Sequence, residues 1–354
     1  MRILSKLTLA MAAGTALMAA LPAASAWAAD ELTITSWGGA YQESQRKAFF
    51  EPFVKDGNKV TEEEYNGEIA KLRAMVESKA VTWDVVDIDT QTALAACAEG
   101  VLETIDWGKL GLDKAKFIGG DLQDCAVPNI VYATIIAYDT SKMPDGPKTI
   151  ADVFDLQKFP GKRGLQKSPF VNLEWALIAD GVPQADVYKM LATPEGVDRA
   201  FKKLDEIKPH ITVWWTSGAQ SAQLVKDGEV DLIGIWSNRM QAVIDDGAEA
   251  QYTYQGGLLI PDCFFIPKGS TKVDLAMKAI AVAASPEIHA NIAQYIPISP
   301  VSSEAFNTGK IPPERAKLLP ASPENLKVQV WTDGDWWAEH GAEVQERWSN
   351  FIQE

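Results

Sequence analysis

The sequence is poor in the residues on which most enzymes and metalloproteins depend. Its 354 residues include three histidines (His210, His289 and His340) and three cysteines, and neither set has metal-site spacing. The motifs G-x-S-x-G, H-E-x-x-H and G-x-x-x-x-G-K-[ST], which mark hydrolases, zinc proteases and phosphate-binding loops, are absent. The sequence therefore gives no positive case for an enzyme, and we expect neither a cofactor nor a metal ion.

Long apolar runs are also missing, except near the N-terminus. Residues 7–21 are apolar and follow a short positively charged start. This run of about fifteen residues is shorter than the roughly 20 that span a bilayer. The small residues Ala26 and Ala28 come next, so we expect residues 1–28 to be a signal peptide cleaved after Ala28, or alternatively after Ala26. No cysteine is available there for a lipid anchor, and the mature chain is predicted to be a soluble periplasmic protein.

Basic residues are outnumbered by acidic ones, 33 to 48, which gives a formal net charge of -15. So acidic a chain has no electrostatic attraction to nucleic acid or to anionic lipid. Its length exceeds what one hydrophobic core usually supports, so two domains are expected. We predict a monomer.

Alternation of strand and helix signals dominates the mature chain and predicts an α/β fold with mostly parallel strands. The expected strands are 32–36, 59–65, 83–89, 129–138, 212–215, 232–236 and 258–267. The expected helices are 42–55, 68–78, 90–99, 172–179, 186–191, 195–207, 219–226 and 331–352. Thr149 and Asp152 form a predicted capping box at the start of a further short helix.

Two α/β units joined by more than one crossover predict a two-lobed clamshell. The predicted lobe 1 comprises residues 29–138 and 262–310, and lobe 2 comprises residues 139–261 and 311–354. Ligands of open α/β sheets bind beyond the carboxyl ends of the strands. Two such edges facing each other would form an inter-lobe cleft that can close on a ligand.

The three cysteines have different expected roles. In an oxidising compartment Cys97 and Cys125 are the predicted disulfide pair, since they are near in sequence and each lies beside the end of an expected element. Cys263 lies in an apolar run and is predicted to be a buried free thiol.

Aromatic and polar residues recur at the ends of the expected strands, and these are the candidate ligand-binding residues. They are Trp37, Asp89, Gln91, Trp215, Ser217, Trp236, Arg239, Asp262 and Tyr295. Asp262 is the most informative, because its neighbours on both sides are apolar and a carboxylate there needs a partner: an internal donor or a ligand cation.

Several candidates have a structural alternative. Asp89 could simply cap the following helix. One of the adjacent Trp214 and Trp215 should belong to the core, since neighbours on a strand face opposite sides. Arg239 could form a surface ion pair.

In the order and spacing of its motifs the chain resembles the extracellular solute-binding proteins of the spermidine/putrescine type. The motifs are Ser36-Trp37-Gly38-Gly39, Trp83-Asp84-Val85-Val86-Asp87, Phe159-Pro160-Gly161-Lys162-Arg163-Gly164, Gly228-Glu229-Val230-Asp231 before Ile235-Trp236, and Ile260-Pro261-Asp262. The resemblance implies a two-lobed fold and an ABC membrane permease as partner. It also implies that Trp37, Trp236, Asp262 and Tyr295 surround an amine, with Asp89 and Gln91 in the same cleft.

The chain departs from the polyamine-binding pattern in lobe 2. Residues 166–172 contain no acid, and the first one after them is Glu174. Ile260 stands where an aromatic residue is usual. The position of Arg239 resembles that of an Arg in a branch of this family that binds γ-aminobutyrate (GABA). In that branch the Arg binds the carboxylate of the ligand. A polyamine and an ω-amino acid both remain open as ligands. The absence of a Tyr-Tyr pair argues against ferric iron.

Two other functions fit the same fold. A binding protein that presents its ligand to a chemoreceptor or sensor would have the same sequence features. A periplasmic enzyme on these lobes would need a facing base and nucleophile, and the sequence offers no such pair.

Overall fold

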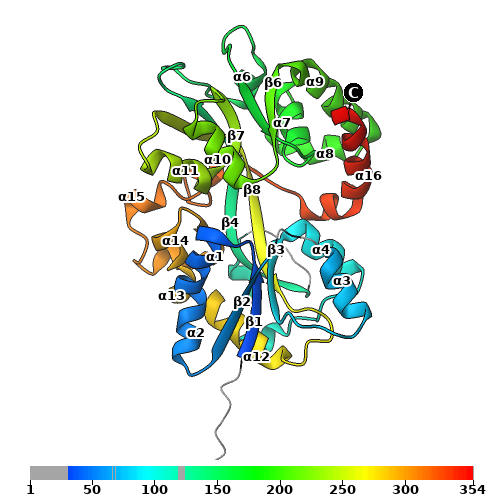
Figure 1. Cartoon of the computed structure of the whole chain (residues 1–354), viewed down its shortest axis with the longest axis vertical. Coiled ribbons are helices and arrows are strands. Elements are labelled where there is room, and N and C mark those ends of the chain that lie inside the picture. Colours follow the sequence, from blue (N-terminus) through cyan, green and yellow to red (C-terminus); the bar gives the residue numbers. More distant parts are fainter. Residues whose placement is uncertain (1–30, 66, 68, 119–123, 354) are drawn as a thin grey trace, which may run out of the picture.

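The computed structural model describes residues 31–65, 67, 69–118 and 124–353. The predicted signal peptide lies outside this part of the chain. The described chain forms two lobes, one above the other in Figure 1, with helices packed around a shared sheet. No helix within the described ranges is long and apolar enough to cross a membrane.

The strands are β1 (Glu31–Ser36), β2 (Lys59–Glu64), β3 (Val85–Asp89), β4 (Ala126–Asp139), β5 (Arg163–Gln166), β6 (Ile211–Trp215), β7 (Leu232–Trp236), β8 (Ala250–Phe265), β9 (Ser299–Pro300) and β10 (Val330–Trp331).

The helices of the first lobe and its return segment are α1 (Gly39–Gln45), a π-helical turn (Arg46–Phe50), α2 (Glu51–Lys55), α3 (Ile69–Glu77), α4 (Thr90–Ala98), α5 (Trp107–Leu110), α12 (Val273–Ala284), α13 (Pro286–His289) and α14 (Ile292–Tyr295). The others are α6 (Ile150–Phe154), α7 (Asn172–Ala179), α8 (Val187–Leu191), α9 (Pro194–Ile207), α10 (Gly218–Lys226), α11 (Ser237–Asp245), α15 (Pro313–Ala316) and α16 (Gly334–Gln353). The described 3₁₀ turns are Lys114–Lys116, Gln184–Asp186, Lys208–His210, Ala305–Asn307 and Asn325–Val328.

Local sequence signals place several helix starts where they were expected. Thr149 and Asp152 form the predicted capping box of α6, in which each residue satisfies a free N–H of the other. Ser217 caps α10 through the backbone N–H of Gln220. Asp89 caps α4 by accepting from the N–H of Thr92 at 2.9 Å, so the capping interpretation of this residue is correct.

The sheet has the strand order β2-β1-β3-β8-β4-β7-β5-β6, with β10 also paired to β8 and β9 to β4. β1 pairs in parallel with β2 and β3, and β5 pairs in parallel with β6 and β7. Antiparallel β8 and β4 lie between these two parallel groups. The prediction of mostly parallel strands therefore holds for the outer strands of each lobe but not for the centre.

The long strands β4 and β8 connect the lobes, as Figure 1 shows. β4 pairs with β8 along most of its length, but with β7 only from Thr134 to Tyr138. β8 pairs with β3 only from Asp262 to Phe265. The chain therefore crosses from one lobe to the other within β4 and again within β8. We propose that the lobe boundaries are those predicted from the sequence.

Each lobe has its own hydrophobic core. In lobe 1, Leu32 and Ile34 of β1 pack with Phe49 and Phe264. In lobe 2, the helices α7, α9 and α16 bury a larger core around Trp175. Tyr132 of β4 packs against both cores. It therefore lies where the lobes meet.

The C-terminal helix α16 touches both lobes. At its first residue, Gly334, an added Cβ would lie 3.1 Å from Leu94 of α4, so the helix starts against lobe 1. Its end packs on lobe 2, where the ring of Trp348 lies 5.5 Å from that of Trp214. Trp337 donates its indole N–H to the buried Glu174 at 2.8 Å. Together with β4 and β8, α16 is a third link between the lobes.

A disulfide joins Cys97 at the end of α4 to Cys125 just before β4, the pairing expected from the sequence. Cys263 is a buried free thiol, so that prediction is confirmed. The bond closes a loop with a sequence separation of 28 residues.

Replacing both bonded cysteines by serine should lower the free energy of unfolding by roughly 3–4 kcal/mol, because the unfolded chain regains the entropy that the closed loop denies it. Thermal or urea unfolding of the double variant measures this loss. Dithiothreitol serves as the control, since it should lower the melting temperature of the wild type and leave that of the double variant unchanged. Equal melting temperatures of wild type and variant without reductant would contradict the prediction.

Candidate functional site

The junction of the lobes contains a buried carboxylate without a partner. Asp262 lies on β8, directly opposite Asp89 of β3. It is 4% exposed, and its Oδ1 has no hydrogen-bond partner in the described protein. Burial raises the pKa of Asp262 well above the usual range, and the charges of Asp87 and Asp89 raise it further. Such a group is poised to take a cation.

Asp87, two residues before Asp89, is fully buried but well supplied with donors. Ser36, Gln45 and Asn129 donate to its carboxylate at 3.0, 2.9 and 2.6 Å. Asp87 was not among the ligand-binding residues predicted from the sequence. Three carboxylates thus lie together on β3 and β8.

A half-buried cation, for which no hydrogen bond or ion pair is present among the described residues, lies in lobe 2. Arg239 is in the first turn of α11, and its Nε is buried without a hydrogen bond among the described residues. Burial lowers the pKa of Arg239, and no carboxylate contributes to this shift. Among the described residues, Arg239 therefore does not form the surface ion pair that was the alternative for it. A guanidinium in this position can take a carboxylate.

Trp236, at the end of β7, lies beside Arg239. A Cβ added at Gly218, the first residue of α10, would lie 2.7 Å from the Trp236 ring and 2.9 Å from Arg239 Nε. Only glycine lets the start of α10 approach both side chains this closely. Ser217, the N-cap of α10, is exposed next to this contact.

Tyr132 lies between Asp262 and Arg239. It was not among the residues predicted from the sequence. Its ring lies 5.9 Å from that of Trp236. Burial raises the pKa of Tyr132, and the carboxylates of Asp262 and Asp89 raise it further, which places the phenol near both. The residues are thus linked in the order Asp262, Tyr132, Trp236, Arg239. The available signal was an aromatic residue in the middle of a long apolar crossover strand.

Trp37 and Gln91 lie on the lobe 1 side. The half-buried Trp37 follows β1, and its ring lies 5.3 Å from that of Tyr65. Its indole N–H is buried without a partner in the described protein. Gln91 is half-buried in the first turn of α4, two residues after the cap residue Asp89.

Trp215 is placed differently from the expectation, while the ligand-binding role of Tyr295 stays a prediction. Trp215 is 0% exposed and donates its N–H to the carbonyl of Gly234 at 2.8 Å. It supports Trp236 from behind, at a ring distance of 5.6 Å, and offers no surface to a ligand. Tyr295 at the end of α14 is 49% exposed, with the Lys47 ammonium 5.9 Å from its ring centre.

The acid that follows the Pro-Gly-Lys segment also lies away from this junction. Glu174 is fully buried beneath α16 and accepts hydrogen bonds from Tyr188 and Trp337 at 2.7 and 2.8 Å. Burial raises the pKa of its carboxyl. Its role is to anchor the C-terminal helix.

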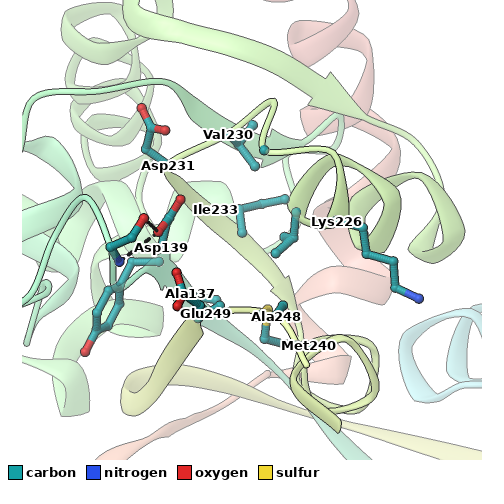
Figure 2. Close-up of a pocket in the computed structure, with 14 residues that line it drawn as sticks. Ala137, Asp139, Lys226, Val230, Asp231, Ile233, Met240, Ala248 and Glu249 are labelled. Carbon is teal, nitrogen blue, oxygen red and sulfur yellow. Dashed lines mark hydrogen bonds between the residues drawn. The ribbon is translucent and has the colours of Figure 1, made fainter. Parts of the chain in front are cut away.

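A separate pocket of about 230 Å³ lies in lobe 2, between β7, α10, α11 and the ends of β4 and β8. Figure 2 shows Asp139, Asp231 and Glu249 on one side of it and Lys226 on the other. Asp231 pairs with Lys142 and accepts from the N–H of Lys162. None of the candidate residues lines this pocket, and its two aspartates already have partners.

Metal chemistry finds no support in the described residues, where no group of three or more His, Cys, Asp or Glu could hold a metal ion. His289 is buried between the rings of Phe49 and Phe117 and contacts the carbonyl of Asn129. Burial lowers the pKa of His289 to about 4, so it is neutral near pH 7. It is a packing residue.

Two α/β lobes joined by central crossover strands define a two-lobed solute-binding protein, and at their junction a buried carboxyl and a half-buried guanidinium lack partners among the described residues. Comparison with known proteins agrees. The model of the bacterial extracellular solute-binding protein family matches residues 49–320, and the chain belongs to this family.

The chain is 38% identical over 331 residues to the gamma-aminobutyric acid-binding protein of Pseudomonas aeruginosa. The aligned residues cover 93% of this chain and 93% of the relative. Among solved structures, the PBP MotA from A. tumefaciens B6 in complex with glucopine has a TM-score of 0.84 at 38% identity, covering 91% of this chain and 99% of that one. The Atu4243 GABA receptor has a TM-score of 0.81 at 37% identity, covering 91% and 98%. These relatives are binding proteins.

Proposed function

We propose that this protein is the periplasmic solute-binding component of an ABC importer and that its solute is an ω-amino acid such as GABA. Residues 1–28 serve as the export signal, and the mature protein acts as a monomer that delivers its solute to a membrane permease. Two relatives with 37–38% identity are named for GABA, which supports this choice of solute.

The observation that carries the proposal is the presence of two groups of opposite charge type without partners in the described protein: the buried Asp262 carboxyl and the half-buried Arg239 guanidinium. An ω-amino acid has an ammonium at one end and a carboxylate at the other, with methylenes between. Asp262 binds the ammonium, Arg239 binds the carboxylate, and Tyr132 and Trp236 cover the methylenes.

The interaction free energies available at this site are sufficient to bind such a ligand with micromolar affinity. A charge-assisted hydrogen bond contributes about 1.5–3 kcal/mol, and an aromatic face beside the ammonium adds about 0.5–2 kcal/mol. Micromolar affinity needs about 8 kcal/mol. One bond at Asp262, a bidentate pair at Arg239 and closure over the aromatic rings reach this value.

A diamine fits less well at the lobe 2 end. Its second ammonium would face the guanidinium of Arg239, for which no ion pair is present among the described residues. Two like charges in a poorly hydrated site repel each other strongly. We therefore propose that putrescine and spermidine bind more weakly than an ω-amino acid.

A thermal-shift comparison of the mature protein tests the choice of solute. GABA at a hundredfold excess over its dissociation constant should stabilise the protein by about 2.7 kcal/mol, a rise of about 5 °C. At equal concentration, n-butylamine and butyrate, each with one charged end of GABA, should give much smaller shifts. The thermal shift with putrescine should also be smaller than that with GABA. A larger shift with putrescine than with GABA would contradict the ω-amino-acid proposal and restore the polyamine.

A further inference from the structure

Three carboxylates share one face of the sheet in lobe 1. Asp262 of β8 pairs directly with Asp89 of β3, and Asp87 lies two residues before Asp89. Side chains two residues apart on a strand point to the same face, and those directly opposite on a neighbouring strand are about 4.5–5.5 Å apart at Cβ. The three acidic groups are therefore close neighbours.

Their hydrogen-bond donors are divided unequally. Asp87 accepts from Ser36, Gln45 and Asn129. Asp89 accepts from the N–H of Thr92 and lies at the N-terminus of α4, where the helix dipole favours a negative charge. The Oδ1 atom of Asp262, in contrast, is buried without a hydrogen-bond donor in the described protein. These donors and the helix dipole favour ionisation of Asp87 and Asp89, although burial raises the pKa of both, whereas Asp262 has no such support.

The pKa shifts agree with this division. Burial raises the pKa of Asp262 well above its usual range, with Asp87 and then Asp89 adding to the effect. Burial also raises the pKa of Asp87, to about 6, although its donors oppose the rise. Of this closely coupled pair, Asp262 is the member that holds a proton most firmly.

Among the described residues, no positive group beside the three acids offsets their charge. The other titratable groups around Asp262 are Tyr41 of α1, Tyr65 after β2, Tyr132 of β4 and Cys263 of β8, and burial raises the pKa of each. All four are therefore uncharged at neutral pH. His289, behind Asn129, is neutral as well.

We propose that Asp262 is protonated in the empty protein and exchanges this proton for the ammonium group of the solute. In the exchange, the Asp262 carboxylic acid gives its proton to solvent, and the resulting carboxylate pairs with the incoming ammonium. The ligand itself changes no protonation state, because an aliphatic ammonium titrates near pH 10. This inference rests on the proposed function, in which Asp262 binds the amine.

The exchange makes affinity depend on pH in one direction. A proton and an ammonium compete for the same oxygen atoms, so the affinity for the amine rises as the pH rises toward the pKa of Asp262 in the empty protein. Acidification weakens binding because the proton becomes harder to displace. Solute capture is thereby linked to the pH of the surroundings.

Isothermal titration calorimetry with GABA tests the exchange. Measured at pH 7 in phosphate and in Tris, whose ionisation enthalpies differ, the observed heats give the number of protons released. We expect about one proton per GABA for the wild type. Asp89→Asn keeps a good helix cap but removes a neighbouring charge, so Asp262 ionises more readily in the empty protein. This variant should release clearly fewer protons.

Asp205→Asn is the matched control, because Asp205 is an exposed carboxylate on α9. It should release as many protons as the wild type. Identical heats in both buffers, from a wild type that still loses GABA binding on substitution of Asp262, would overturn the proton exchange and leave the proposed function intact. Absence of GABA binding by calorimetry and by thermal shift would instead overturn the proposed function.

Discussion

Asp262→Asn should weaken GABA binding by about two to three orders of magnitude and at the same time raise the melting temperature of the empty protein. The affinity falls because removing one partner of a buried charge pair costs about 2–5 kcal/mol. The stability rises because the buried acid has no partner among the described residues. The unfolded chain ionises Asp262 freely at neutral pH, whereas folding forces it toward protonation.

The sign of this stability effect follows from the raised pKa of Asp262. The folded empty protein binds more protons than the unfolded chain, so its stability decreases as pH rises above the ordinary carboxyl pKa of about 4. An asparagine does not titrate, and the variant should gain roughly 1–3 kcal/mol over wild type at pH 7. The gain should shrink toward pH 4.

Calorimetry measures the affinity, and thermal unfolding between pH 4 and 8 measures the stability. Asp205→Asn, on the exposed face of α9, should change neither. Loss of binding together with a lower melting temperature would mean that Asp262 supports the fold instead of the ligand. Unchanged affinity would remove Asp262 from the site altogether.

Arg239→Met should separate the two ends of the solute. Methionine retains much of the apolar stem that packs near Trp236 and Gly218 but has no guanidinium. The affinity for GABA should fall about 100-fold, since a bidentate guanidinium–carboxylate pair in a buried site is worth about 2–4 kcal/mol. The affinity for n-butylamine, which has no carboxylate, should change by less than about threefold.

Arg73→Met is a suitable control, because Arg73 lies on α3 and pairs with Glu99 away from the lobe junction. Its GABA affinity should equal that of wild type. Arg239→Lys should recover part of the lost GABA affinity through charge alone. Equal losses for GABA and n-butylamine in Arg239→Met would refute a carboxylate-binding role for this residue.

Sequence patterns predicted the features that depend on near neighbours in the chain. The capping box at Thr149 and the cap at Asp89 each involve residues within four positions of one another in the sequence. The apolar residues on both sides of Asp262 indicated a buried carboxylate, and the structure buries it. Strand and helix order followed from periodicity, and with it the two-lobed α/β class.

Features that depend on distant segments were beyond such patterns. Whether Trp214 or Trp215 faces the core is decided by what covers each face of β6. Trp348, more than a hundred residues later, packs on Trp214, while the carbonyl of Gly234 takes the N–H of Trp215. The place of Tyr132 in the site depends likewise on both lobes closing around β4.

The interleaved strands also determine the order in which the chain can fold. β8 lies between β3 and β4 in the sheet, so the lobe 1 sheet is incomplete until residues 262–265 are available. The contact of Gly334 with Leu94 comes later still in synthesis. Contacts between residues so distant in sequence make folding slow. We infer that lobe 1 does not complete its fold while the chain is still emerging from the ribosome.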